Sequence, residues 1–199
     1  MLTGDIYLTP DPDANDFLKA NAFGLLVGML LDQQIPMERA FSAPYLLDRR
    51  LHKHHGLELQ PAAIVSLGEE QLVAMFSEKP ALHRFPKSMA TKCLSVAERI
   101  VADYHNDASA LWEEASSGSD ALLRLQSLNG FGIDKAKIFL ALLGKRFHVA
   151  PEGWQAASEP FGRADEFRSV ADASSPQALE KVRAFKTSMK LAHKTGQRM

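Results

Sequence analysis

The feature that most constrains this chain is a glycine-containing connector between two apolar segments, within residues 125–144. Gly130 and Gly132 follow a segment that ends at Leu128 and precede one that begins at Ile133. Two glycines in so short a connector permit a positive φ or a close backbone approach. The first N–H groups of the second helix have no intrahelical acceptors and, with the helix dipole, attract a phosphate. The pattern predicts two helices joined by an anion-binding turn.

Apolar residues recur at three- and four-residue spacing through most of the chain, and alternating strand patterns are scarce. With 46% apolar residues among 199, the chain can build a real core. We therefore predict an all-α protein. Helices are expected over residues 23–31, 37–51, 61–66, 69–77, 96–104, 108–115, 119–127, 133–144, 153–159 and 179–189.

The composition excludes several classes of protein. No stretch reaches the ~20 uninterrupted apolar residues of a membrane-spanning helix. The N-terminal residues 1–12 have no basic start followed by an apolar core, so we expect a cytoplasmic protein without membrane contact. Cys93 is the single cysteine, which excludes an internal disulfide and a cysteine-ligated iron–sulfur cluster.

The formal net charge of −1 is unusual for a DNA-binding protein, because such proteins commonly present a basic surface. Positive charge is nevertheless concentrated around the connector and near the C-terminus. Each cluster is either a solvated helix face or a surface for a polyanion. The two clusters are Lys135, Lys137, Lys145, Arg146 and His148, and Lys181, Arg183, Lys186, Lys190, Lys194 and Arg198.

The connector resembles the helix–hairpin–helix motif, whose usual form is Leu-Pro-Gly-Val-Gly; here Asn129 replaces the proline and Phe131 the valine. About a hundred residues upstream, an apolar helix runs through Asp32 into Gln33 and Gln34. This is similar to the early helix of the helix–hairpin–helix DNA glycosylase superfamily, which ends in Ser-x-Gln or Ser-Gln-Gln. Together the motifs resemble short bacterial base-excision repair proteins of that superfamily that have no iron–sulfur cluster.

The resemblance implies a single bilobal all-helical domain over residues 1–199. Residues 25–128 would form a central helical barrel lobe, and residues 1–24 with 129–199 the second lobe. The cleft between the lobes would receive a nucleotide extruded from double-stranded DNA. The resemblance also implies a monomer that works at the nucleoid.

The resemblance assigns DNA contacts to the hairpin, to the helix after it and to the glutamine pair. Gln34 would fill the gap left by the extruded nucleotide, because an amide has both donors and acceptors. Trp154 would stack on the extruded base. The carbonyls of Leu128 and Gly130 would bind a K⁺ or Na⁺ ion, and no other cofactor is expected. The DNA-binding residues would be Gln33, Gln34, Asn129, Gly130, Phe131, Gly132, Ile133, Lys135 and Lys137.

The catalytic carboxylate is the point at which this chain departs most from the superfamily. Members carry an aspartate about twenty residues after the second hairpin glycine, where this chain has Glu152 or, in another alignment, Gly153. A carboxylate there stabilises the positive charge that develops on the sugar and can activate water. Glu152 is therefore either the catalytic acid on a longer arm or a first-turn helix residue favoured by the dipole.

Members with lyase activity carry a lysine nucleophile two residues after the second hairpin glycine, and this chain has Asp134 there. Asp134 either caps its helix or is a relocated catalytic carboxylate. We therefore expect a monofunctional DNA glycosylase, which hydrolyses the N-glycosidic bond of a flipped damaged base without lyase activity. The alternatives are an inactive lesion-binding module of the same fold and a protein-interaction domain.

Overall fold

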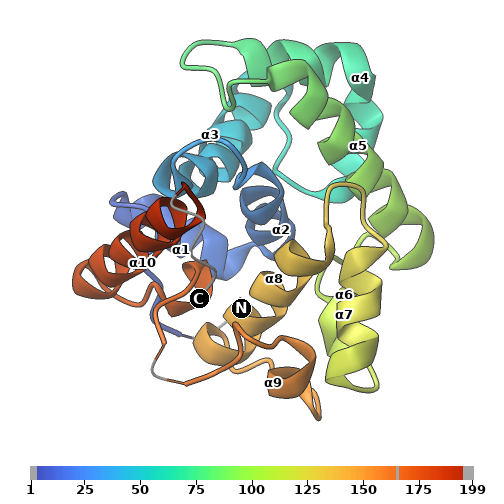
Figure 1. Ribbon diagram of the computed structural model, residues 1–199. Helices are drawn as coiled ribbons and strands as arrows, with labels where there is room; N and C mark the ends of the chain where they lie inside the picture. Colours follow the sequence, from blue (N-terminus) through green and yellow to red (C-terminus); the bar gives the residue numbers. More distant parts are fainter. Residues whose placement is uncertain (1–3, 165, 195–199) are drawn as a thin grey trace.

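The described part of the chain folds into helices joined by loops (Figure 1), which confirms the predicted all-α class. The computed structural model describes residues 4–164 and 166–194, and it assigns no β-strand there. None of the helices in that part of the chain combines the length and apolar character of a membrane span. The elements are α1 (Pro12–Ala20), α2 (Ala22–Leu31), α3 (Met37–His55), α4 (Pro61–Ser77), α5 (Pro86–Asp103), α6 (Ala110–Glu113), α7 (Gly118–Gln126), α8 (Ile133–Arg146), α9 (Trp154–Ala157), the 3-10 helix η1 (Val170–Asp172) and α10 (Pro176–Lys194).

Helix α2 lies at the centre of the fold (Figure 1), and every residue from Phe23 to Leu31 is buried. It packs against α1, α3 and α5. A helix that is apolar on all sides requires such enclosure, since no face is left for water. A Cβ at Gly28 would lie 2.7 Å from the Phe41 ring, so this glycine sets how closely α3 approaches.

Helices α3, α4 and α5 pack next to one another at the end of the molecule shown uppermost in Figure 1. Within α4, Gly68 has non-helical angles (φ 72°, ψ 174°), so two helical segments meet there as the sequence predicts. The buried guanidinium of Arg50 on α3 donates to the carbonyls of Met75 at 2.6 Å and Pro80 at 2.8 Å. These bonds join α3 to the end of α4.

The thiol of Cys93 is buried in α5. Burial raises its pKa to about 12, because the thiolate would lose its hydration.

Helices α7 and α8, with the connector between them, form a helical hairpin, and α8 also packs against α9 and η1. Near its C-terminal end, Lys145 Nζ lies 2.6 Å from an Asp172 carboxylate oxygen, with the two side chains only 10% and 5% exposed. The other Asp172 oxygen accepts the N–H groups of Arg168 and Ser169. This buried pair fastens η1 to α8.

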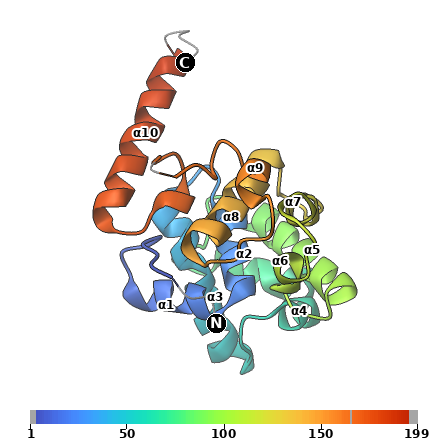
Figure 2. The same cartoon turned by 90° about the horizontal axis from the view of Figure 1, so that it is seen from below.

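Helix α10 starts on the body of the protein and then projects away from it (Figure 2). Ala178, Leu179 and Val182 are buried where it begins, whereas Met189 and Leu191 are exposed farther along. Its first part therefore packs like an amphipathic helix. Arg198, the last residue of the C-terminal basic cluster, lies outside the described residues.

Replacement of Asp172 by alanine should destabilise the fold by about 3–5 kcal/mol, because it leaves the Lys145 ammonium buried without a counter-charge. The matched control is Asp103→Ala, which removes the ion pair with Arg99 on the exposed surface of α5, where the side chains are 43% and 52% accessible. That change should cost less than about 1 kcal/mol. Urea denaturation of both variants measures the two values, and equal losses would contradict the assignment.

Candidate nucleic-acid interface

The glycine-containing connector forms a tight turn between α7 and α8. Gly130 has a left-handed φ of 91°, and the Phe131 N–H donates to the Leu128 carbonyl at 3.0 Å. The Phe131 ring is buried and meets the Phe139 ring edge-on, with centroids 6.1 Å apart. This ring anchors the turn to the core, and Gly132 on its C-terminal side is exposed.

The start of α8 offers several backbone donors. Gly132 is its N-cap and makes no side-chain capping bond. The N–H groups of Gly130, Gly132 and Ile133 have no acceptor among the described residues. Gly132 and Ile133 are exposed, and Gly130 is half-buried. Such a group of free amides at the positive end of a helix dipole suits a phosphate.

The hairpin lies directly against the C-terminal turn of α2. A Cβ at Gly130 would be 2.6 Å from Leu30 Cδ1, so only glycine permits this approach. From the first turn of α8, Lys135 Nζ donates to the carbonyls of Met29 and Leu30, each at 2.8 Å. The ammonium thus caps α2, because the last carbonyls of a helix have no donors within the helix. The distance between the hairpin and α2 is therefore fixed.

Burial lowers the pKa of Lys135 to about 8. The nearby Lys92 lowers it further, and the opposite charge of Asp32 raises it. The sequence assigned Lys135 to DNA contact, but the structure commits its ammonium to two internal carbonyls.

The two glutamines after α2 differ in their surroundings. Gln33 folds back, and its Nε2 donates to the Leu30 carbonyl at 2.9 Å and contacts the Met89 sulfur at 3.2 Å. The carbonyl of Gln33 lies 2.9 Å from Nε2 of the buried His83. Gln34 is exposed, has a left-handed φ of 56°, and its side chain has no hydrogen bond within the described segments. Gln33 therefore holds the turn, and Gln34 is presented to solvent.

The structure separates Glu152 and Trp154 from the hairpin. Both follow α8, whose 14 residues span about 21 Å at 1.5 Å per residue. Figure 1 shows α9 at the end of α8 remote from the hairpin. The Glu152 carbonyl accepts the Gly118 N–H at 2.7 Å, and the half-buried Trp154 ring covers Gly144 near the end of α8. Glu152 and Trp154 thus lie near each other but away from the turn that carries Gln33 and Gln34, which we call the glutamine turn.

Three other predicted residues lie on or near the first turns of α8. Asn129 and Asp134 are exposed, and Lys137 is half-buried. Gly132 is the N-cap residue, so Asp134 does not cap the helix as one interpretation of the sequence expected. Asp134 instead occupies the first turn, where the helix dipole favours its charge.

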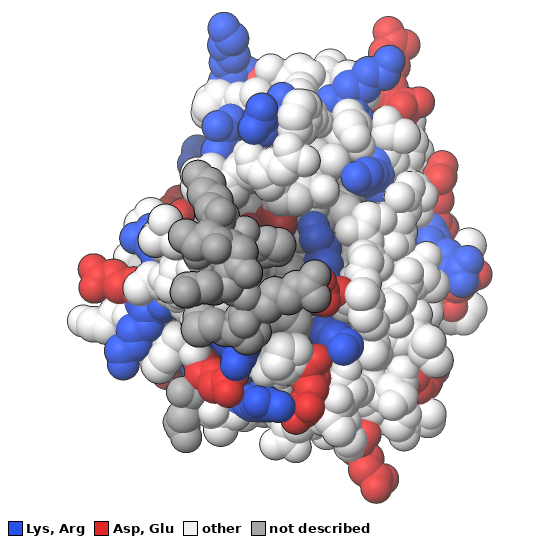
Figure 3. Space-filling view, in the orientation of Figure 1, with Lys and Arg blue, Asp and Glu red and all other residues white. Residues whose placement is uncertain are grey.

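The face shown in Figure 3 is hollowed near its middle, and both acidic and basic side chains lie in the hollow. A groove of about 430 Å³ separates the segment after α2 from α10. Asp32, Ile35 and Glu38 line one side, and Val182 and Lys186 line the other. The sequence identified Asp32 only as a departure from the serine of the resembling motif, and it gave no signal that α10 would face it.

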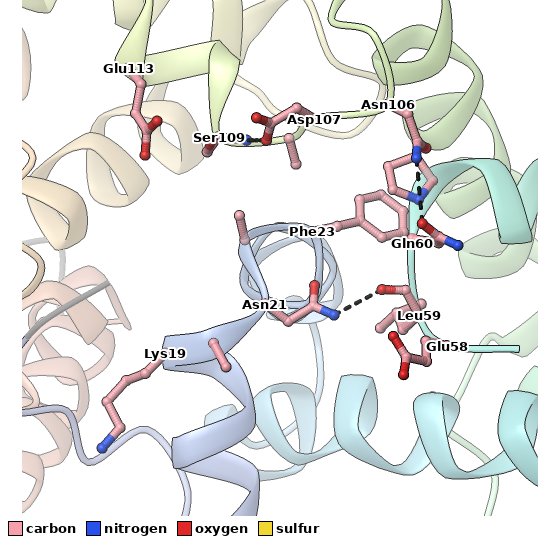
Figure 4. A pocket seen from close by; sticks show the side chains of 14 residues that line it. Lys19, Asn21, Phe23, Glu58, Leu59, Gln60, Asn106, Asp107, Ser109 and Glu113 are labelled. Atoms are coloured by element: carbon pink, nitrogen blue, oxygen red, sulfur yellow. Dashed lines mark hydrogen bonds between the residues drawn. The ribbon is translucent and has the colours of Figure 1, made fainter. Parts of the chain in front are cut away.

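A second pocket of about 390 Å³ lies at the opposite, N-terminal end of α2 (Figure 4). Glu58, Asp107 and Glu113 line it together with a single basic residue, Lys19. The amide of Asn21 donates to the Leu59 carbonyl at 2.8 Å. An excess of carboxylates repels a phosphate, so this pocket does not suit a nucleic-acid backbone.

Comparisons with protein-family models, with curated proteins and with solved structures find no match to this chain. The class of protein is therefore defined by its own geometry. It is an all-helical protein in which an outward-facing hairpin with free amides is fastened beside an exposed glutamine.

The lowered pKa of Lys135 predicts how stability depends on pH. The ordinary lysine pKa is 10.5 and the folded value is about 8. Between these values the unfolded chain holds a proton that the folded chain has released, so the Lys135 contribution to the free energy of unfolding rises with pH. Urea denaturation at pH 8 and pH 10 should show wild type gaining stability relative to Lys135→Met as the pH rises. Lys137→Met on the same helix is the control, and parallel curves for wild type and Lys135→Met would contradict the prediction.

Proposed function

We propose that this protein binds double-stranded DNA and excises damaged bases as a monofunctional DNA N-glycosylase. The observation that carries the proposal is the contact between the hairpin and the glutamine turn. Gly130 touches Leu30, and Lys135 caps the helix that leads to Gln34. A phosphate-binding turn (the phosphate seat) and an exposed amide side chain lie at a fixed separation. This arrangement suits a protein that binds the backbone of one strand and inserts a side chain into the duplex beside that contact.

In this proposal the N–H groups of Gly130, Gly132 and Ile133 bind one phosphate. The Phe131 N–H is already paired with the Leu128 carbonyl, so it contributes to the shape of the turn rather than to the phosphate. A carbonyl oxygen has two acceptor lone pairs, which leaves the Leu128 oxygen able to contact a K⁺ or Na⁺ ion together with the Gly130 carbonyl. Such a cation would neutralise part of the phosphate charge.

Gln34 would enter the space that an extruded nucleotide leaves. Its amide can replace part of the lost base pairing. The left-handed backbone at Gln34 is uncommon for a residue other than glycine and is typical of positions where function imposes the conformation. Gln33, whose amide is bound to the Leu30 carbonyl, would support the turn.

The side chains near the hairpin support a reaction without lyase chemistry. Asp134 occupies the position that carries the lysine nucleophile in the resembling lyases, and a carboxylate cannot form a Schiff base. The neighbouring amine of Lys135 donates to two carbonyls and points into the protein. We therefore propose hydrolysis of the N-glycosidic bond without cleavage of the strand.

The same proposal includes a bilobal domain with residues 25–128 in one lobe and the two ends of the chain in the other. It also includes a monomeric protein located at the nucleoid. A second candidate function, a lesion-binding protein without catalysis, is favoured by the position of Glu152 beyond the far end of α8. The two functions share the DNA-binding surface and differ only in the release of a base.

The experiment that separates these functions is mass-spectrometric detection of free bases. Duplex DNA treated with a methylating agent, with nitrous acid or with peroxide is incubated with the protein, and the filtrate is analysed. We expect one class of modified base to be released without strand cleavage. Tight binding to a duplex that contains a tetrahydrofuran abasic-site analogue, with no base released from any preparation, would instead establish the lesion-binding function.

The phosphate seat is tested by Ile133→Pro, which removes one backbone donor. Ile133 is the first residue of α8, and Gly132 before it has φ −66° and ψ 169°, a conformation compatible with a following proline. Loss of one hydrogen bond to a charged group should weaken binding of the tetrahydrofuran duplex about tenfold in fluorescence anisotropy. The control Ile133→Ala retains the N–H. Equal affinities of the two variants would exclude this donor from the DNA contact.

A further inference from the structure

The segment between α2 and α3 places a carboxylate beside the proposed DNA-binding elements. Asp32 is the C-cap of α2, and its backbone N–H donates to the carbonyls of Gly28 and Met29. It lies two residues before Gln34 and lines the groove that α10 closes on the other side. Two residues of chain span at most about 7 Å, so the backbone of Asp32 lies within that distance of the backbone of Gln34.

The carboxylate of Asp32 has no structural task in the described residues. It is half-buried, and its oxygens make neither a hydrogen bond nor an ion pair there. Lys135 is the nearest candidate partner on α8, but its ammonium is bound to two carbonyls. Polar groups with reduced hydration are normally paired, and an unpaired one in a folded protein calls for a functional explanation.

The charged groups around Asp32 come from three helices. Lys135 on α8 and Lys186 on α10 lower its pKa, and Glu38 on α3 raises it. Burial outweighs the two lysines, so the pKa of Asp32 is raised above its usual range. A carboxylate with a raised pKa is a stronger base than an ordinary one.

The other carboxylates that the sequence suggested do not share this environment. Glu152 lies beyond the end of α8 remote from the hairpin, and Asp134 is exposed on the first turn of α8. Neither lines the groove between the segment after α2 and α10. Asp32 is the acidic residue of that groove nearest in the chain to Gln34.

We propose that Asp32 is the catalytic carboxylate of this site and contacts the sugar of an extruded nucleotide during hydrolysis of its N-glycosidic bond. This inference rests on the proposed function and assigns the residue that performs its chemistry. The negative charge of Asp32 stabilises the positive charge that develops on the sugar.

The reaction proceeds with a simple balance of bonds and protons. The bond between C1′ and the base nitrogen breaks, and its electron pair leaves with the base. A water oxygen forms the new bond to C1′ and transfers one proton to Asp32. The base takes a proton from solvent, and Asp32 returns its own proton to solvent. The positive charges of Lys135 and Lys186 favour the ionised form of Asp32 before the water attacks.

The test compares Asp32→Asn with Glu152→Gln in the full chain. Base release is measured between pH 5 and pH 9 on the chemically treated duplexes, and binding is measured on the tetrahydrofuran duplex. We expect Asp32→Asn to lower base release about 100-fold or more at pH 7 and to leave binding within about threefold. Wild-type activity should fall as the pH decreases through the raised pKa of Asp32. Glu152→Gln should keep the wild-type rate and the same pH profile.

Asp32→Glu serves as the variant that retains a carboxylate and separates chemistry from folding. It should restore part of the lost activity and keep an acid-side decline in rate, whereas Asp32→Asn should lack that decline. Base release by Asp32→Asn above about a tenth of the wild-type rate would overturn the assignment while leaving the proposed function intact. Equal loss of activity in Asp32→Asn and Asp32→Glu would also overturn it. A wild-type protein that releases no base would overturn the proposed function, and with it the role of Asp32.

Discussion

The two hydrogen bonds from Lys135 to the end of α2 connect every part of the proposed interface. The last carbonyls of a helix need donors from outside the helix, and here one ammonium and the Gln33 amide supply them. Because the ammonium comes from α8, the contact between α2 and α8 links the turn that carries Gln34 to the turn that carries the free amides. A shift of α8 would therefore move both.

The contact between α2 and α8 also brings helix ends of opposite partial charge together. The C-terminal end of α2 is the negative end of its dipole, and the N-terminal end of α8 is the positive end of the other. The positive charge of Lys135 interacts unfavourably with the dipole of its own helix, α8, and favourably with the dipole of α2. The position of the ammonium therefore depends on the contact between these two helices. The buried ammonium also opposes the effect of burial on the pKa of Asp32, since the two opposite charges stabilise each other.

Local sequence patterns predicted the helices better than they predicted the site. The all-α class, the hairpin turn and the interruption of α4 at Gly68 all follow from short-range rules of spacing and glycine content. The position of Glu152 does not follow from such rules, because it depends on the direction that the chain takes after α8. The tight turn at residues 147–153 keeps Glu152 beside Gly118 instead of returning it to the hairpin. The groove beside Asp32 was equally hidden, since α10 reaches it only through tertiary packing.

Although the net charge of the chain is close to zero, the charged side chains around the two ends of α2 differ in sign. The pocket at the N-terminal end of that helix is acidic, and lysines from α5, α8 and α10 gather near its C-terminal end. A polyanion that approaches the molecule is repelled from one end and attracted to the other. A nearly neutral protein can therefore orient a nucleic acid without a large excess of basic residues.

The burial of Cys93 gives this chain a useful chemical property. It is the single cysteine of the sequence, and with its pKa at about 12 it offers almost no thiolate to alkylating reagents near neutral pH. A cysteine introduced on the outward-facing hairpin or on the projecting part of α10 would therefore be the one reactive thiol. Fluorophores or spin labels can be attached there with the native Cys93 left in place, so distances across the groove become measurable in the intact protein.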